Sequence, residues 1–280
     1  MKIIECPRDA MQGIEKFIST EDKVRYLNQL MKVGFDTIDT GSFVSPKAIP
    51  QMRDTAEVLD RVEVGASRSK LLAIVANTRG AEEACRHKAV TYVGFPLSVS
   101  ETFQQRNTNK SIPEALDSLN DIQEICETTG KTLVTYLSMG FGNPYNDPYD
   151  ISVIGKFVDI LSTLEVKIIS IADTIGVSKP DQIKYLIKNL NEDFPSIEFG
   201  LHLHSNPLTA IEKIDAAVEA GCKRFDGAIK GFGGCPMAED KLVGNLATET
   251  ILSYLDSKGI QTGLDRAEFA KAMKVAEEVF

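Results

Sequence analysis

The sequence lacks the features that mark several classes of protein. No stretch of its 280 residues approaches the ~20 apolar residues that a membrane-spanning helix needs. Basic residues are not in surplus, because the formal net charge is −9 and the isoelectric point lies near 5.0. The first residues run directly into apolar sequence, so we expect no targeting peptide. We therefore expect neither a membrane nor a nucleic acid as partner.

The cysteines show no pattern of disulfide cross-links. The five of them form no Cys-x-x-Cys pair and no even set, which argues against a disulfide framework. That pattern suits a reducing compartment, and we expect a cytoplasmic location. What the chain does contain is 43% hydrophobic residues, enough for a substantial core, and no linker or change of composition. We expect residues 1–280 to form a single catalytic domain.

Predicted strands and helices alternate along the whole chain. Short apolar runs bounded by turn residues predict strands, and amphipathic stretches with capping signals predict helices. We expect strands at residues 2–6, 35–39, 71–76, 90–95, 131–137, 167–172, 197–204 and 223–227. We expect helices at residues 20–33, 49–60, 79–87, 111–129, 151–164, 179–191, 208–220, 245–258 and 266–279.

This alternation predicts the fold class. Apolar strands that alternate with amphipathic helices form a parallel sheet covered by helices. Eight such units with one helix left over favour a closed (β/α)8 barrel, the TIM barrel, with an additional C-terminal helix. A doubly wound open sheet is the alternative. In a barrel, the functional groups lie at the carboxyl ends of the strands, where this sequence places most of its candidate residues.

Two of the three histidines, His202 and His204, lie one residue apart at the end of a predicted strand. Strand side chains alternate between faces, so both imidazoles point the same way. Asp9, after the first strand, would add an oxygen to their two nitrogens, a set that suits a divalent ion. The alternatives are a pair of hydrogen-bonded structural histidines and an aspartate that only caps a helix or loop.

Four further residues are candidates for chemistry at the same mouth. Arg8 offers donors to a carboxylate or an enolate oxygen, or else only forms a salt bridge, for example with Asp39. Asp39 and Asp173 are acid–base or substrate-orienting candidates, or they only hold Arg8 or a ligating histidine. Cys235 lies in a glycine-rich segment, where its thiol can carry protons, unless it is an ordinary partly buried thiol.

Five segments, in order along the chain, resemble the 3-hydroxy-3-methylglutaryl-CoA lyase family. The resemblance spans nearly the whole sequence. Its arginine–aspartate pair and His-x-His mark only a wider superfamily of metal-dependent TIM-barrel lyases and synthases, whereas the second and last segments are specific to the lyase branch. The segments are residues 7–12, 42–47, 172–177, 202–204, and 233–236 with 244–249.

The resemblance implies roles for individual residues. It implies a divalent metal, Mg²⁺ or Mn²⁺ with Zn²⁺ or Co²⁺ as further options, held by Asp9, His202, His204 and Asn245. It implies that Arg8 steadies an enolate, that Asp173 is an acid–base or substrate contact, and that Cys235 lies on a lid loop. Ser42 and Ser170 match positions along the pantetheine arm of an acyl-CoA. The family and the extra helix together suggest a homodimer.

We therefore expect a carbon–carbon lyase that cleaves 3-hydroxy-3-methylglutaryl-CoA, or a close 3-hydroxyacyl-CoA, to acetoacetate and acetyl-CoA by a retro-Claisen reaction. Asp39 or Asp173 would take the first proton, and Cys235 or His202 would supply the last. The sequence also departs from the family, with Asp39 in place of a glutamate, Ser205-Asn206 in place of Asp-Thr, and a longer, more charged lid at 236–244. These departures motivate two alternatives, an aldolase for a 4-hydroxy-2-oxo acid and a barrel that binds without catalysis.

Overall fold

The protein is a closed barrel of parallel strands. The computed structural model describes residues 1–65, 67–234 and 243–280. Each strand pairs with the next in sequence, and β8 pairs with β1, so the sheet has no edge. This confirms the predicted (β/α)8 barrel and excludes the open sheet. The strands are β1 (Lys2–Glu5), β2 (Thr37–Ser42), β3 (Lys70–Ile74), β4 (Val90–Ser98), β5 (Thr132–Ser138), β6 (Ile168–Asp173), β7 (Glu198–Leu203) and β8 (Arg224–Gly227).

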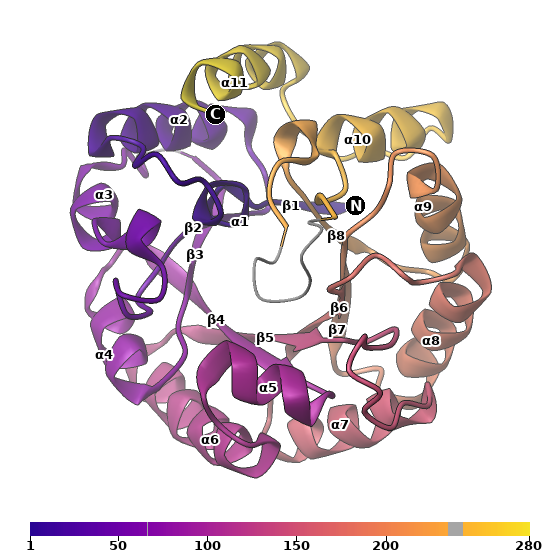
Figure 1. The fold of residues 1–280 in the computed structure, drawn as a ribbon. Helices are drawn as coiled ribbons and strands as arrows, with labels where there is room; N and C mark the ends of the chain where they lie inside the picture. The colour runs from indigo at the N-terminus through magenta and orange to yellow at the C-terminus, as the bar shows by residue number, and fades with distance from the viewer. Residues whose placement is uncertain (66, 235–242) are drawn as a thin grey trace.

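Helices surround the barrel as an outer ring (Figure 1). Over the described part of the chain, none of them is long and apolar enough to cross a lipid bilayer. The α-helices are α1 (Pro7–Gln12), α2 (Thr20–Val33), α3 (Thr55–Arg61), α4 (Thr78–Arg86), α5 (Glu101–Thr108), α6 (Ile112–Thr129), α7 (Ser152–Thr163), α8 (Pro180–Asp193), α9 (Ala210–Glu219), α10 (Thr248–Ser257) and α11 (Arg266–Val279). Two short 3₁₀ helices, η1 (Pro50–Met52) and η2 (Ile229–Gly231), complete them.

Helix boundaries follow the predicted signals where the caps are strong. The Ser19 side chain accepts from the backbone N–H of Asp22 and starts α2, and Gly34 ends that helix with a left-handed φ of 78°. Helix α6 begins with the predicted capping box, in which Ser111 and Glu114 satisfy each other's backbone N–H groups. Strong local hydrogen bonds of this kind make the ends of a helix readable from sequence.

The strands expected at 35–39 and 90–95 extend further, to Ser42 and Ser98. Four of the helix predictions were wrong. Helices α1 and α5 were not predicted, because six and eight residues are too few for a helical period to show. The helix expected at 49–60 is divided into η1 and α3. The helix expected from residue 245 begins at Thr248 instead, because Asn245 and Ala247 form isolated bridges to the strand ends at His204 and Ala228.

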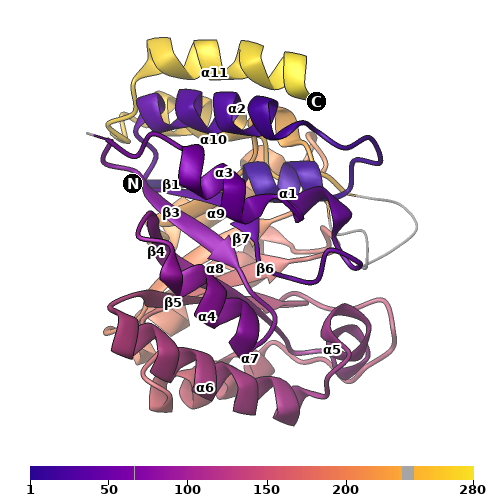
Figure 2. The same cartoon turned by 90° about the vertical axis from the view of Figure 1, so that its left-hand side faces the viewer.

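The predicted extra helix is present as α11, which lies against the outer side of α2 (Figure 2). Phe269 of α11 meets Phe35 edge to face, with ring centroids 6.3 Å apart. The C-terminal Phe280 packs in the same way against Tyr26 of α2, at 5.5 Å. Aromatic contacts of this kind add to the area that the helix buries. Helix α11 is therefore part of the folded body of the barrel.

Glu5 joins the start of the barrel to its end. It is the last residue of β1 and is fully buried. Its two carboxyl oxygens accept from the backbone N–H of Ile229 at 2.8 Å and from the hydroxyl of Thr248 at 2.6 Å. Burial raises the pKa of Glu5 to about 8, even though both hydrogen bonds oppose that shift. The seam between β1 and the segments after β8 is thus closed by a carboxyl group that resists ionisation.

The raised pKa makes the seam sensitive to pH. Because the folded protein keeps its proton on Glu5 up to about pH 8 while the unfolded chain loses it near 4.5, the free energy of unfolding falls between these values, by up to ~1.4 kcal/mol per pH unit. Glu5→Gln keeps an acceptor and a donor at this position but cannot ionise. We expect the variant to gain stability over the wild type as pH rises from 5 to 8 in urea unfolding. Parallel pH profiles for the two proteins would contradict this.

Candidate active site

A pocket that is partly open to solvent lies at the carboxyl ends of the strands. It brings together residues from the ends of strands β1 to β7 and from the connections that follow them. Its polar lining includes Arg8, Asp9, Gln12, Asn107, Thr108, Tyr136, Ser138, Thr174, His202 and His204. Its apolar lining is formed by Val44, Ala48, Ile49, Ile74, Ala76, Pro96, Phe103 and Ala172. Four of the residues singled out from the sequence therefore share this one pocket: Arg8, Asp9, His202 and His204.

The two histidines face each other through their Nε2 atoms, which are 3.2 Å apart. The Nδ1 of His202 lies 3.2 Å from a carboxyl oxygen of Asp226, and the Nδ1 of His204 lies 2.9 Å from the carbonyl oxygen of Val243. Both partners are acceptors, which assigns the N–H of each ring to Nδ1 and leaves a lone pair on each Nε2. Two lone pairs at this separation repel, so the pair favours a proton or a cation between them.

The surroundings shift the pKa values of the two imidazoles in opposite directions. Burial alone would lower the pKa of His202, but the hydrogen bond and charge of Asp226 raise it above its ordinary value. Burial and the neighbouring His202 lower the pKa of His204 to about 4. Without a metal, His202 is therefore the ring that carries an added proton.

Asp9 completes a cluster of three possible ligands. Helix α1 places it beside the histidines, and one ligand atom from each of the three residues lies within 4.8 Å of the others. Burial would raise the pKa of Asp9, but Arg8 and the histidines lower it to about 2, so the carboxylate is ionised. One carboxylate oxygen and two imidazole nitrogens, all buried, are a donor set that fits a divalent cation.

Asn245 comes to the same cluster from the far end of the chain. Its side-chain amide donates to Asp9 at 2.6 Å and to the carbonyl oxygen of Phe232 at 2.9 Å. Its role as a metal ligand stays a prediction. The predicted catalytic Cys235 lies outside the residues that the structure describes.

Arg8 holds Asp39 with two donors. Its Nε and Nη2 atoms lie 2.9 Å and 2.6 Å from the same oxygen of Asp39, while Nη1 donates to Asp9 at 3.0 Å. The aspartate at this position is therefore long enough to reach the arginine. Its other oxygen, Oδ1, is buried and has no hydrogen-bond partner among the described residues. Burial raises the pKa of Asp39 to about 6 although Arg8 opposes the shift, which suits a proton acceptor near neutral pH.

The carboxylate of Asp173 already accepts hydrogen bonds from its neighbours. Its carboxylate accepts from the backbone N–H groups of Val177 and Ser178, both at 2.9 Å, and from Lys213 at 3.1 Å. Its carbonyl oxygen accepts from the backbone N–H of His204 at 3.2 Å. These contacts position the loop after β6 and the end of β7. The acid–base role expected of Asp173 stays a prediction.

Ser42 and Ser170 are not among the residues that line the pocket. The hydroxyl of Ser42 accepts from the backbone N–H of Val44 at 3.1 Å. Ser170 is fully buried, and its hydroxyl donates to Asp226 over 3.4 Å. Contact of either serine with a pantetheine arm therefore stays a prediction.

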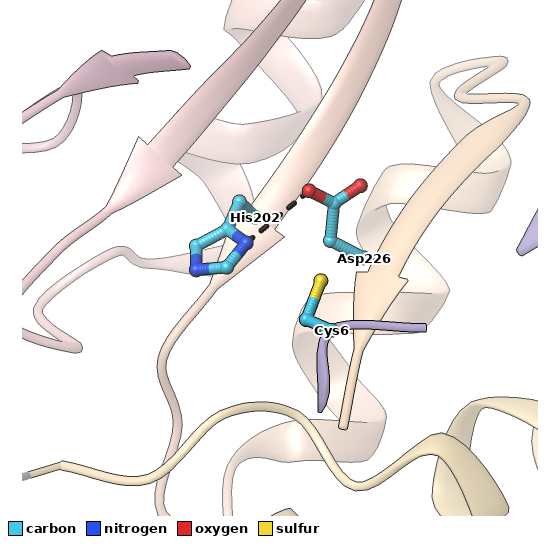
Figure 3. Close-up of side chains that lie close together, drawn as sticks. All are labelled: Cys6, His202 and Asp226. Atoms are coloured by element: carbon cyan, nitrogen blue, oxygen red, sulfur yellow. Dashed lines mark hydrogen bonds and ion pairs between the residues drawn. The ribbon is translucent and has the colours of Figure 1, made fainter. Parts of the chain in front are cut away.

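Sequence reasoning missed two buried charged residues, Lys213 and Asp226. Lys213 is 2% exposed and lies on the inward face of α9, where an apolar residue would be usual. Asp226 is 1% exposed and lies within β8, opposite His202 in the strand pairing (Figure 3). A charged residue inside an otherwise apolar element was the available signal in both cases. A buried charge needs a partner. Asp226 contacts His202 directly. Lys213 is paired with Asp173, whose carbonyl oxygen accepts from the backbone N–H of His204.

Comparison with known proteins identifies the family. The HMGL-like family model matches residues 2–276. Hydroxymethylglutaryl-CoA lyase YngG of Bacillus subtilis is 35% identical over 275 residues, which cover 97% of this chain and 90% of that protein. A Pseudomonas aeruginosa protein named 3-hydroxy-3-isohexenylglutaryl-CoA/hydroxy-methylglutaryl-CoA lyase is 33% identical, with coverage of 95% and 88% respectively.

Solved structures agree with this assignment. The HMG-CoA lyase of Bacillus subtilis superposes with a TM-score of 0.92 at 33% identity, covering 99% of this chain and 92% of that one. An HMG-CoA lyase of Acinetobacter baumannii, solved with coenzyme A and 3-methylmalate, also gives 0.92, at 28% identity and coverage of 100% and 90%. The chain therefore belongs to the HMGL-like family of carbon–carbon lyases.

Proposed function

We propose that this protein is a divalent-metal-dependent lyase that cleaves 3-hydroxy-3-methylglutaryl-CoA to acetoacetate and acetyl-CoA. The observation that carries the proposal is the buried cluster of Asp9, His202 and His204, which lines one pocket together with Arg8. Arg8 in turn holds the buried Asp39 behind it. The relatives named above act on this thioester or on a close one. A retro-Claisen cleavage needs a Lewis acid, a general base and a positive charge that stabilises the enolate, and a metal site, Asp39 and Arg8 would supply these three.

Asp9, His202 and His204 would hold the cation, with Asn245 as a fourth ligand. Mg²⁺ or Mn²⁺ bound there would supply Lewis-acid chemistry at the substrate's hydroxyl and carboxylate. The ring orientations support this assignment, because both Nε2 lone pairs already face the cluster. Asp226 and Val243 keep that orientation from the other side of each ring.

The chain's own residues move the protons. Asp39 accepts the proton of the tertiary hydroxyl, for which its unpartnered oxygen and its pKa of about 6 suit it. The carbon–carbon bond then breaks, leaving a ketone and a thioester enolate. Arg8 stabilises the negative oxygen of the enolate, since its guanidinium stands between two aspartates at the pocket wall. Cys235 returns a proton to the enolate carbon, which completes the thioester product. His202, the other residue predicted for this step, cannot do so while its Nε2 holds the cation, because its proton is then on Nδ1 and bonded to Asp226.

The apolar side of the pocket supports a substrate with a larger alkyl group as a second candidate. Residues from the β2–α3 and β3–α4 connections and from β4 and α5 form this side, among them Ile49, Ala76, Pro96 and Phe103. An apolar wall gains free energy from each methylene that it removes from water. The Pseudomonas aeruginosa relative is named for an isohexenyl thioester as well as for the methyl one. The cytoplasmic location and the homodimer stay predictions from the sequence, whereas the lyase relatives argue against the aldolase and the non-catalytic barrel.

The direct test incubates the purified protein with 3-hydroxy-3-methylglutaryl-CoA and Mg²⁺ or Mn²⁺. We expect acetoacetate and acetyl-CoA in equal amounts, and no product after chelation of the metal. A parallel panel should contain a 3-hydroxyacyl-CoA with a longer alkyl group and a 4-hydroxy-2-oxo acid. Cleavage of the oxo acid alone, with every thioester untouched, would replace this proposal with the aldolase.

Arg8→Lys tests the role of the arginine. Lysine keeps the positive charge but cannot hold Asp39 through two donors while presenting a third, so we expect kcat to fall about 100-fold. Mn²⁺ binding, followed by electron paramagnetic resonance, should be nearly unchanged because the ligands remain. Arg61→Lys, at an exposed ion pair, is the matched control. A kcat close to that of the wild type would remove Arg8 from the reaction.

Asp226→Asn tests whether the Asp226 carboxylate orients the His202 ring for metal binding. The neutral amide weakens the hydrogen bond that fixes the ring, and loss of such a carboxylate typically lowers metal affinity about 10- to 100-fold. Calorimetric titration with Mn²⁺ measures this directly, and Asp226→Glu should recover part of the affinity. An unchanged dissociation constant in the asparagine variant would show that Asp226 does not orient the ligand.

A further inference from the structure

The second nitrogen of His202 belongs to another cluster of buried ligand atoms. Cys6 at the end of β1, His202 of β7 and Asp226 of β8 point toward one another (Figure 3). One ligand atom from each residue lies within 4.8 Å of the others. Cys6 and Asp226 are each 1% exposed, and His202 is 8% exposed and lines the pocket. The cluster is therefore buried but adjoins the pocket through the His202 ring.

The three side chains match the ligand preferences of a thiophilic divalent ion. Thiolate, imidazole and carboxylate together are a donor set typical of Zn²⁺, which takes four ligands in a tetrahedron. The Nδ1 of His202 and the Oδ2 of Asp226 are 3.2 Å apart, close to the separation of two ligands at ~2.0–2.1 Å from a tetrahedral ion. The Oδ1 of Asp226 is buried and, among the described residues, has no hydrogen-bond partner.

Charge also favours a cation at this place. The carboxylates of Asp226, Asp39 and Asp9 lie near enough to Cys6 to act on it as negative charges, and such charges attract a cation. A thiolate and a carboxylate neutralise a divalent ion, so the loaded cluster would carry no net charge in the interior. Arg224 lies on the same face of β8 and its positive charge acts on Asp226, which offsets part of this attraction, although its Nη1 is paired with Glu198 at 3.3 Å.

We propose that Cys6, His202 and Asp226 form a second metal site, selective for thiophilic ions such as Zn²⁺ and Cd²⁺, whose occupation excludes metal from the Asp9–His202–His204 cluster. Binding at Nδ1 puts the proton of a neutral His202 on Nε2, and the thiol of Cys6 gives its proton to solvent as the metal–sulfur bond forms. The ring then has no lone pair left for the first cluster. The existence of the second site is independent of the proposed function, whereas the exclusion rests on it.

The binding test uses Cd²⁺, because a cadmium–thiolate bond gives an ultraviolet charge-transfer band that oxygen and nitrogen ligands do not give. We expect the band in the wild type and its complete loss in Cys6→Ser and in Cys6→Ala, with far-ultraviolet circular dichroism confirming that the variants are folded. Cys85→Ser, at a free and half-buried cysteine outside the cluster, is the matched control and should retain the band. Absence of the band in the wild type, or its survival in both Cys6 variants, would overturn the second site.

The exclusion is tested by repeating the Cd²⁺ titration with Mn²⁺ present. With Mn²⁺ at about ten times its dissociation constant, mass action should raise the Cd²⁺ midpoint about tenfold. An unchanged midpoint would show that both metals bind together and would overturn the exclusion. A protein that gives the cadmium band but never forms acetoacetate would refute the proposed function and leave the second site standing.

Discussion

Two imidazole nitrogens held 3.2 Å apart, each with its lone pair turned toward the other, determine what the mouth of this barrel can bind. Neither ring is free to turn away. Asp226 fixes His202 from one side, and the carbonyl oxygen of Val243 fixes His204 from the other. The backbone of His204 is itself tied to Asp173, whose carboxylate is paired with the buried Lys213. Two facing lone pairs repel each other unless a proton or a cation lies between them. The ionised Asp9 in the same cluster would attract that positive charge as well.

Arg8 divides two carboxylates into different roles. It contacts both Asp9 and Asp39, yet the pKa of Asp9 is lowered to about 2 and that of Asp39 is raised to about 6. At Asp39, burial and the charge of Asp9 outweigh Arg8 and raise the pKa. At Asp9, burial is outweighed by the charges of Arg8 and both histidines and by the hydrogen bond from Asn245, which lower the pKa. One carboxylate therefore stays charged, as the proposed metal site requires, while its neighbour can exchange a proton near neutral pH.

The sequence predicted most of the fold and the centre of the site, for local reasons. Helix α2 could be bounded because Ser19 caps it and Gly34 ends it, and the alternation of strand side chains placed both imidazoles on one face. Asp226 could not be found in this way. It meets His202 only through the register between β7 and β8, which neither strand's own pattern contains. The contact between Lys213 and Asp173 could not be predicted for the same reason, because it joins residues 40 positions apart.

The hydrogen bond between Asp9 and Asn245 joins residues 236 positions apart. Glu5 likewise closes the barrel only by reaching Ile229 and Thr248. During synthesis on the ribosome, the N-terminal strand therefore emerges long before any of these partners exist. The half-made chain carries Arg8 and Asp9 without their counterparts, so it can neither close the ring nor assemble the cluster of Asp9, His202 and His204. Formation of the proposed metal site is thereby coupled to synthesis of the segment after β8.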